Sequence, residues 1–275
     1  MNLTRNPVPS RAPASRFGPI MRLAVVAFAL AVVAAACGSS DDESATSTTE
    51  PASATTVAAE PTAFCDALVQ VDAAFAAGGP EGPDPATLQS AFQAAQESAP
   101  EAIAADVDRA IELSQEAFSA DPEAEPPAEL EEVDGRIDAY ALDNCNLEDV
   151  AVTGVDYSYQ GIPASLASGR TAFSFTNNSA SGEFHELIVL RLNDDTTESV
   201  DELLMLPMEE ALSKVSVMAA AFAPQGATDV TFADLTPGRY VVACFIPVGS
   251  IGDAQPSEDA PPHAAQGMVA QFTVT

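Results

Sequence analysis

The chain of 275 residues is 47% hydrophobic and has no tryptophan. This length and composition allow about two folded domains, whose cores must depend on Phe, Leu, Val and Ile. The 41 acidic and 10 basic residues give a formal net charge of −31. Because a surface of that charge repels phosphate backbones, the composition excludes nucleic acid as a partner.

The first 36 residues have the pattern of a secretory signal. Four arginines flank an apolar run over residues 23–36, and no acid occurs before Asp41. A positive flank, a short apolar stretch and small residues before a cut site are typical of such signals. The run is too short for a membrane-spanning helix. We therefore expect an extracytoplasmic protein.

The signal ends in Ala34-Ala35-Ala36-Cys37-Gly38, which resembles the cleavage site of bacterial lipoproteins. The resemblance implies that Cys37 becomes the lipidated first residue, anchored to the outer face of the bacterial cell membrane. Ordinary cleavage after Ala36, which would leave Cys37 a free thiol, is the alternative. The processed chain keeps 41 acidic and 6 basic residues, a charge of −35. That charge disfavours direct contact with anionic lipid, so attachment would depend on the lipid anchor.

Residues 37–61 lack large apolar side chains and predict a disordered tether. Residues 62–146 then show apolar residues at helical spacing. Four amphipathic helices are expected to start near Thr62, Pro85, Pro100 and Pro127. Their short connections favour an up-down-up-down four-helix bundle, which we interpret as a structural or partner-binding module.

Two cysteines lie at the ends of this helical segment. Cys65 falls in the first turn of the first helix and Cys145 at the end of the fourth. In an up-down bundle these points meet at one end, so a disulfide is expected, and the secreted compartment permits it. A redox-active pair is the alternative, but no Cys-x-x-Cys spacing supports it.

Residues 147–275 change to β character. A short helix is expected over 198–205, and the segment 208–222 fits either a helix or a strand. Six runs read as strands bounded by turn residues: 150–159, 170–177, 183–192, 227–235, 238–247 and 268–275. The predicted fold class is α+β in separate domains, a four-helix bundle followed by an antiparallel β-sandwich.

Soft and borderline metal ligands gather around the last two strands. Cys244 ends one strand, and His263 and Met268 precede the next, while His185 stands in another strand-like run. Two imidazoles, a thiolate and a thioether are the donors of a mononuclear copper site. Strand alternation points Cys244 inward, and it is the cysteine left unpaired when the others are assigned.

The segment resembles the C-terminal part of cupredoxins of the plastocyanin and azurin type, and the resemblance spans roughly residues 148–275. The matching residues are Gly238, Tyr240, Cys244, Pro247, His263, Gly267, Met268, and upstream the run Phe175 to Asn178 followed by His185. The resemblance implies a copper site formed by His185, Cys244, His263 and Met268. Two features depart from the family: 18 residues separate Cys244 from His263, and Glu186 stands where the family often has Asn.

Two functions remain open at this level. The first is a lipid-anchored, cupredoxin-like copper protein that transfers electrons or handles copper with a redox or envelope protein partner, and is not an enzyme. The second is a metal-free envelope binding or scaffolding lipoprotein, in which Cys244, Met268 and the histidines are ordinary core residues. A hydrolase is disfavoured because the chain has no Gly-x-Ser-x-Gly motif.

Overall fold

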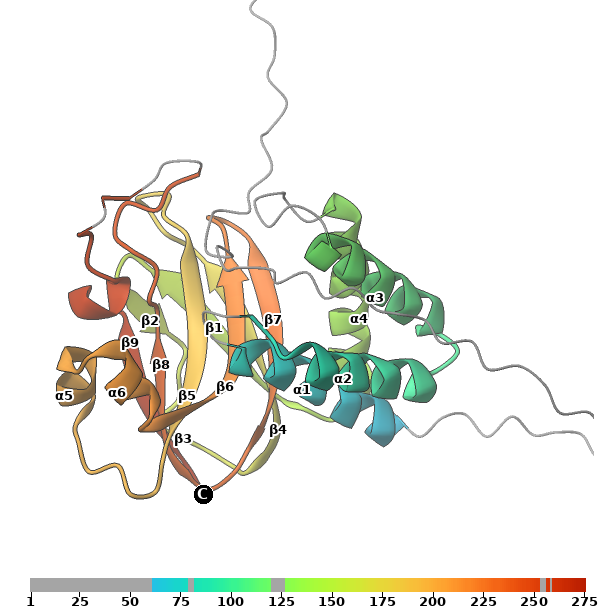
Figure 1. The fold of residues 1–275 in the computed structure, drawn as a ribbon, viewed down its shortest axis with the longest axis horizontal. Helices are drawn as coiled ribbons and strands as arrows, with labels where there is room; N and C mark the ends of the chain where they lie inside the picture. Colours follow the sequence, from blue (N-terminus) through green and yellow to red (C-terminus); the bar gives the residue numbers. More distant parts are fainter. Residues whose placement is uncertain (1–60, 79–81, 120–126, 253–255, 258) are drawn as a thin grey trace, which may run out of the picture.

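The computed structural model describes residues 61–275 except 79–81, 120–126, 253–255 and 258. The chain forms a helical region beside a β region built of two sheets (Figure 1). The predicted signal, Cys37 and the tether lie outside the described residues. Among the described residues, no helix combines the length and the apolar character that a membrane span requires.

Four helices occur where apolar spacing predicted them: α1 (Pro61–Ala77), α2 (Pro85–Ser98), α3 (Ala104–Ser119) and α4 (Ala128–Asn144). At the start of α2, the Asp84 carboxylate accepts a hydrogen bond of 2.8 Å from the Thr87 backbone N–H, and Pro85 occupies the first turn. This is the expected cap and first-turn proline. The helices share one apolar cluster that includes Phe64, Phe92 and Ile111.

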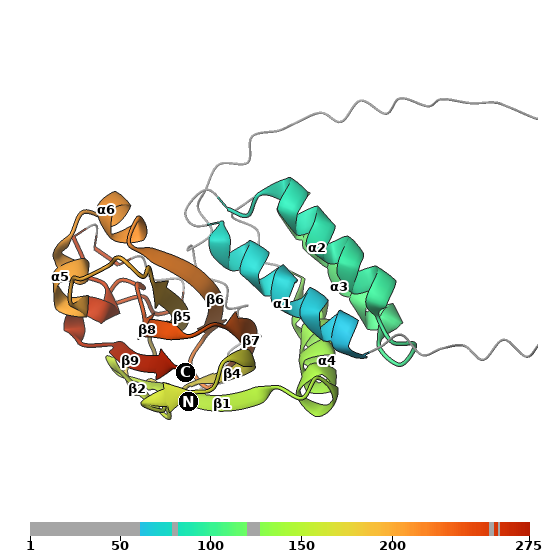
Figure 2. The same cartoon turned by 90° about the horizontal axis from the view of Figure 1, so that it is seen from below.

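The arrangement of these helices differs from a bundle with one common axis. In Figure 1, α4 runs across the direction of α1 and α2, and in Figure 2 it is seen nearly end-on while α1 and α2 lie in the plane. The expected up-down-up-down bundle is therefore not confirmed. Ala141 of α4 also shares an apolar cluster with Ala172 and Phe232 of the β region, so α4 has neighbours outside the helical region.

The predicted disulfide is present. Cys65 of α1 is bonded to Cys145, which directly follows α4, and their Cα atoms lie 5.5 Å apart. In the chain-entropy account, closing a loop of this size stabilises the fold by about 4 kcal/mol. The bond therefore holds the two ends of the helical region together.

The β region consists of a four-stranded sheet, in the order β2-β1-β4-β7, and a five-stranded sheet, in the order β3-β9-β8-β5-β6. The strands are β1 (Glu148–Val155), β2 (Ser158–Gln160), β3 (Ser165–Leu166), β4 (Gly169–Asn177), β5 (His185–Leu192), β6 (Val215–Ala223), β7 (Thr228–Leu235), β8 (Gly238–Ala243) and β9 (Val269–Val274). The expected strand over 150–159 is divided between β1 and β2 by a turn in which Tyr157 has a φ of 59°.

The sheets are mixed, so the prediction of a wholly antiparallel sandwich is wrong. β1 pairs with β4 in parallel, and β3 pairs with β9 in parallel, whereas the other strand pairs are antiparallel. The chain leaves β1, visits the other sheet at β3, and then returns as β4. Because of that excursion, β4 enters beside β1 in the same direction.

The facing sides of the two sheets form the main core. Phe173 and Phe175 of β4 meet Leu187 of β5 and Val242 of β8, and all four side chains are fully buried. Burial of each such side chain contributes about 1.5–3 kcal/mol relative to exposure. These strands fall within the runs bounded by turn residues that predicted them.

The segment that fitted either a helix or a strand contains both. Its first residues form α6 (Met208–Leu212), and the rest form β6. Before it lies the expected short helix, α5 (Val200–Met205), which starts with a capping box between Ser199 and Glu202. The helices α5 and α6 lie beside the short 3-10 helix η3 (His263–Gln266) in Figure 1.

The helical region packs against the β region through α1, which lies against β6 and β7 (Figure 2). An apolar cluster at this junction contains the disulfide and the side chains of Val69, Ala172 and Phe232. The junction is therefore partly a hydrophobic core of its own.

Candidate metal centre

Three predicted ligands lie where elements begin or end, at one end of the β region. His185 is the first residue of β5, Cys244 directly follows β8, and His263 is the first residue of η3. β5 and β8 are antiparallel neighbours, so the start of one lies beside the end of the other. The sheet register therefore brings His185 and Cys244 together.

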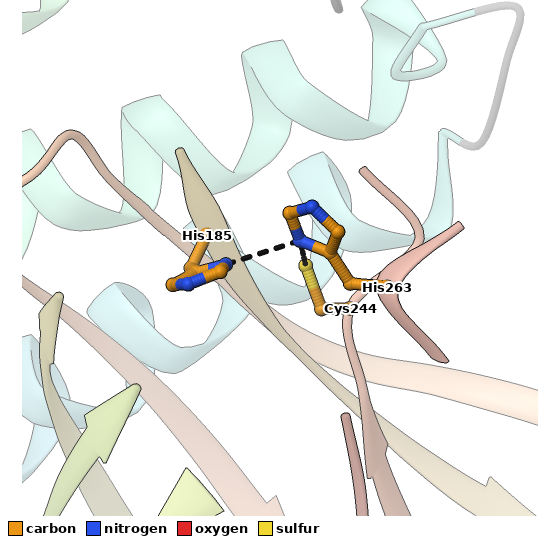
Figure 3. A group of neighbouring side chains, drawn as sticks. All are labelled: His185, Cys244 and His263. Atoms are coloured by element: carbon orange, nitrogen blue, oxygen red, sulfur yellow. Dashed lines mark hydrogen bonds between the residues drawn. The ribbon is translucent and has the colours of Figure 1, made fainter. Parts of the chain in front are cut away.

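The three side chains converge on a common point, as Figure 3 shows. His185 Nδ1 lies 3.1 Å from His263 Nδ1, and Cys244 Sγ lies 3.3 Å from the same His263 atom. One ligand atom from each residue falls within 4.8 Å of the others, and all three residues are fully buried. This is the convergence that the predicted ligand set requires.

The long loop between Cys244 and His263 does not separate them, because its two arms pair with each other. The His263 backbone N–H donates to the Ile246 carbonyl oxygen at 2.9 Å. Further out, the Val248 N–H donates to the Pro261 carbonyl oxygen, also at 2.9 Å. This backbone stem brings the chain back to Cys244. His263 therefore lies next to Cys244 even though more residues separate the two than is usual in cupredoxins.

Met268, the fourth predicted ligand, is fully buried in the same apolar cluster as Cys244. Its carbonyl oxygen accepts a 3.2 Å hydrogen bond from the Cys244 N–H, and its own N–H donates to the His263 carbonyl oxygen at 3.1 Å. The Cε methyl lies close to Gly154 of β1, where a Cβ would approach it to 3.2 Å. Met268 thus contacts the backbone of two other candidate ligands, and its role as an axial ligand stays a prediction.

Glu186 braces the Cys244 end of the site, a role that the sequence interpretation did not assign to it. Its backbone N–H donates to Cys244 Sγ at 3.5 Å, and its Oε1 accepts a 2.6 Å hydrogen bond from the Phe245 N–H. This contact adds a side-chain hydrogen bond to the backbone pairing of β5 with β8. The carboxylate therefore supplies the bracing contact at the position where the family often has Asn.

Glu183 was also missed, and it covers the other side of His263. The residue is 3% exposed, and its Oε1 lies 3.5 Å from His263 Nε2. Its Oε2 accepts hydrogen bonds from Ser181 Oγ at 2.8 Å and from the Tyr157 hydroxyl at 3.1 Å. The Tyr157 ring meets the His263 ring edge-on, with centroids 5.2 Å apart. An acidic residue two positions before a strand-opening histidine was the available sequence signal.

The buried setting controls which atoms carry protons. Burial, aided by the charge of His263, lowers the pKa of His185 to about 4, and burial also lowers the pKa of His263. Both imidazoles are therefore neutral near pH 7, as metal ligands must be. Burial, together with the charge of Glu186, raises the pKa of the Cys244 thiol to about 12. A metal ion would thus have to displace the thiol proton.

The two carboxyl groups next to the ligands differ from each other. Burial raises the pKa of Glu186 to about 7, although the hydrogen bond from Phe245 opposes that shift. Burial acts in the same direction on Glu183, but the hydrogen bonds from Gly249, Ser181 and Tyr157 outweigh it and hold the pKa below the usual range. Glu183 is therefore ionised at neutral pH.

The donor set fits a soft or borderline metal ion. Two imidazole nitrogens face each other at 3.1 Å, and only one of the two can carry a proton between them. Within the described part of the chain, the Nε2 atoms of both His185 and His263 are buried without a hydrogen-bond partner. A cation held by both Nδ1 atoms and the Cys244 thiolate would leave a proton on each Nε2. A His₂Cys set with a weak thioether nearby is characteristic of mononuclear copper.

Comparisons with known proteins give structural neighbours but no family. No family model and no curated protein matches the chain. Among solved structures it is similar to auracyanin B, with 21% identity, a TM-score of 0.31, and coverage of 46% of this chain and 88% of that one. It is also similar to auracyanin A, described as a "blue" copper protein from Chloroflexus aurantiacus, with 17% identity, a TM-score of 0.30, and coverage of 46% and 98%.

A multicopper oxidase from Pediococcus acidilactici is similar at 13% identity and a TM-score of 0.26, with coverage of 47% of this chain and 26% of that one. At these TM-scores none of the likenesses carries an argument about function. The case for a metal centre rests on the geometry of His185, Cys244 and His263.

Proposed function

We propose that the chain is a cupredoxin-like copper protein of the bacterial cell envelope, acting as an electron carrier or in copper handling. The observation that carries this proposal is the buried convergence of His185, Cys244 and His263 on one point. Copper bound there would supply a one-electron change between Cu(I) and Cu(II).

The residues of the chain have distinct roles in this proposal. His185 and His263 present neutral Nδ1 atoms, Cys244 provides the thiolate, and Met268 is the proposed weak axial ligand. Glu186 restrains the Cys244 backbone through Phe245. A fully buried set held by backbone hydrogen bonds is preorganised, which favours electron transfer because little has to move.

A carrier is favoured over an oxidase by the histidine count. The chain has two histidines in all, and both lie in this one site. No imidazole remains for a second copper centre of the kind that a multicopper enzyme would need. We therefore propose that the chain is not itself a catalyst and passes electrons or copper to a redox or envelope protein partner.

We further propose that Cys37 is lipidated and anchors the protein to the outer face of the cell membrane. The support is the small-residue ending before Cys37 in the sequence. In cells that express the full chain, the wild type should sediment with membranes. A Cys37→Ser variant should appear in the soluble extracytoplasmic fraction, and equal partitioning of the two proteins would refute the anchor.

Copper uptake tests the central part of the proposal. The chain from residue 38 onward is titrated with Cu(II), and its visible spectrum is compared with that of Cys244→Ser. We expect one copper per chain and an intense thiolate-to-copper band that the variant lacks. If the wild type takes up no stoichiometric copper, the metal-free envelope binding or scaffolding protein becomes the better interpretation.

A further inference from the structure

Glu183 is a buried acid that faces the outer nitrogen of a candidate copper ligand. Three neutral donors hold its carboxylate in place: the Gly249 backbone N–H at 2.5 Å, Ser181 Oγ at 2.8 Å and the Tyr157 hydroxyl at 3.1 Å. It also lies 3.5 Å from Nε2 of His263, whose imidazole is neutral near pH 7. This contact does not have hydrogen-bond geometry, so the carboxylate acts on the imidazole through its own negative charge.

Burying a carboxylate without a cation is costly, so its placement here needs a reason. The donors around Glu183 are themselves held by neighbouring groups. Ser181 Oγ lies 3.0 Å from Asp156 Oδ1, and Asp156 also accepts a 2.6 Å hydrogen bond from Ser179 Oγ. Ser179 Oγ in turn accepts a 3.2 Å hydrogen bond from the Glu183 backbone N–H. The network fixes the carboxylate beside His263 rather than letting it turn toward solvent.

The carboxylate also selects the tautomer of His263. A protonated Nε2 facing Glu183 is attractive, whereas a bare lone pair there would be repelled. With the proton on Nε2, the lone pair lies on Nδ1, the atom that faces Cys244 and His185. Ligating histidines commonly present their second nitrogen to a carboxylate in this way, which raises the basicity of the ligand.

The two histidines differ in whether their Nε2 atom lies beside a carboxylate. His185 Nε2 is buried with no partner among the described residues, and no salt bridge to it is found there. Direct contact with a carboxylate is therefore found at His263 and not at His185 among the described residues, although the charges of Glu183 and Asp156 also act on His185 from a greater distance.

We propose that Glu183 is a positioning residue that orients His263 and biases the bound copper toward Cu(II). This inference rests on the proposed copper function and deepens it. Oxidation removes one electron from the centre and gives it to an external acceptor, which makes the centre more positive. A fixed negative charge next to a ligand stabilises that state relative to Cu(I).

The test is the substitution Glu183→Gln, which keeps size and hydrogen-bonding capacity but removes the charge. Cu(II) and Cu(I) affinities are measured separately by chelator competition, and the midpoint potential is measured by spectroelectrochemical titration with a soluble redox dye. We expect the ratio of Cu(II) to Cu(I) affinity to fall about tenfold, which is the smaller effect typical of losing a group that orients a metal ligand. For one electron this fall corresponds to a potential raised by about 59 mV.

Two further variants separate charge from packing. Glu209→Gln makes the same chemical change on the exposed surface of α6 and should leave the potential unchanged. Tyr157→Phe keeps the ring beside His263 but removes one of the donors that offset the charge of Glu183, so the potential should fall when it is measured at a pH at which the carboxylate stays ionised. This variant also serves as the test if Glu183→Gln does not fold.

The outcomes distinguish this inference from the proposed function. If the wild type takes up no copper, both are overturned. If the wild type binds copper and Glu183→Gln has the same potential, only the role of Glu183 is overturned. A rise of equal size in Tyr157→Phe would also overturn it, because the effect would then come from packing around His263.

Discussion

The Asp72 carboxylate, on α1, accepts a hydrogen bond of 2.6 Å from the backbone N–H of Phe232, in β7. The same oxygen accepts a second bond, of 3.0 Å, from the Thr231 hydroxyl. A helix side chain thus satisfies backbone and side-chain donors of a strand in the other region. This contact joins the helical region to the sheet beside their shared apolar cluster.

Acidic residues gather around this contact, and the neighbouring charges that shift their pKa values all belong to other acidic residues. They comprise Asp72 on α1, Asp134 and Asp138 on α4 and Asp229 on β7, with Glu131 acting on Asp229. Burial is the main cause in each case, and it raises the pKa of Asp138 to about 9, of Asp72 to about 7 and of Asp134 and Asp229 to about 6. Asp134 is exposed, so solvent screening reduces its contribution to the pH dependence of stability.

These pKa values predict a fold that weakens as the pH rises. A carboxyl group whose pKa is raised by folding binds its proton more tightly in the folded state. Its contribution is complete below its ordinary pKa near 4 and is lost as the pH passes through the raised value. Thermal unfolding temperatures should therefore decline between about pH 6.5 and pH 9, above the range in which the lowered pKa of His185 acts in the opposite direction.

Asp138→Asn should flatten this decline and raise the unfolding free energy at pH 8 by at least about 1 kcal/mol. Denaturant unfolding across this pH range makes the measurement. Asp143→Asn, at an exposed position of the same helix, is the matched control. A pH profile that Asp138→Asn leaves unaltered would contradict the account of this junction.

Loss of the disulfide should weaken the fold but leave the metal centre intact. The double variant Cys65→Ala/Cys145→Ala should lower the free energy of unfolding by about 2–5 kcal/mol. Because the candidate ligands lie in the β region, the variant should keep the copper band of the wild type. Guanidinium unfolding measures the loss of stability, and a copper titration of the same sample measures the band. Loss of the band would contradict the prediction, because the disulfide would then affect the metal centre.

Met268→Leu tests the predicted axial ligand, since it removes a thioether and nearly conserves the side-chain volume. We expect the intense band to persist and the potential to rise by roughly 59 mV for each tenfold loss of relative Cu(II) affinity. Met205, which is 86% exposed on α5, provides the control Met205→Leu. Equal potentials in all three proteins would show that Met268 is an ordinary core residue.

Glu186 should matter through its hydrogen bond to Phe245. Glu186→Ala leaves the Phe245 N–H without that acceptor and should lower the stability of the metal-free protein by about 1–3 kcal/mol. Glu186→Gln retains an acceptor oxygen and should recover most of that loss. The measurement is urea unfolding of both variants at one pH, and equal losses would refute the bracing role.

Much of the fold follows from local sequence patterns. The spacing of residues such as Leu88 and Phe92 predicted the helices, and β-forming runs bounded by turn residues predicted the strands that carry Phe175 and Val242. The parallel pairing of β1 with β4 did not follow, because strand direction depends on the route of the chain between sheets. The crossing of α4 did not follow either, because apolar spacing predicts which face of a helix is buried and not the angle at which the helix crosses its neighbours.

Three residues that meet at the candidate site could be picked out from the sequence, whereas their surroundings could not. His185, Cys244 and His263 stand out because histidines and unpaired cysteines are few in this chain. Glu183 and Glu186 did not stand out among 41 acids. The stem that brings His263 back to Cys244 is formed by backbone hydrogen bonds, and the residue types in the loop do not predict those bonds.

X-ray absorption at the copper edge, on the protein loaded with one equivalent of Cu(II), tests the central claim most directly. Binding by His185, Cys244 and His263 predicts one short copper–sulfur contact and two copper–nitrogen contacts of imidazole type. The sulfur contact should disappear in Cys244→Ser. A first coordination shell made only of oxygen and nitrogen in the wild type would contradict the account.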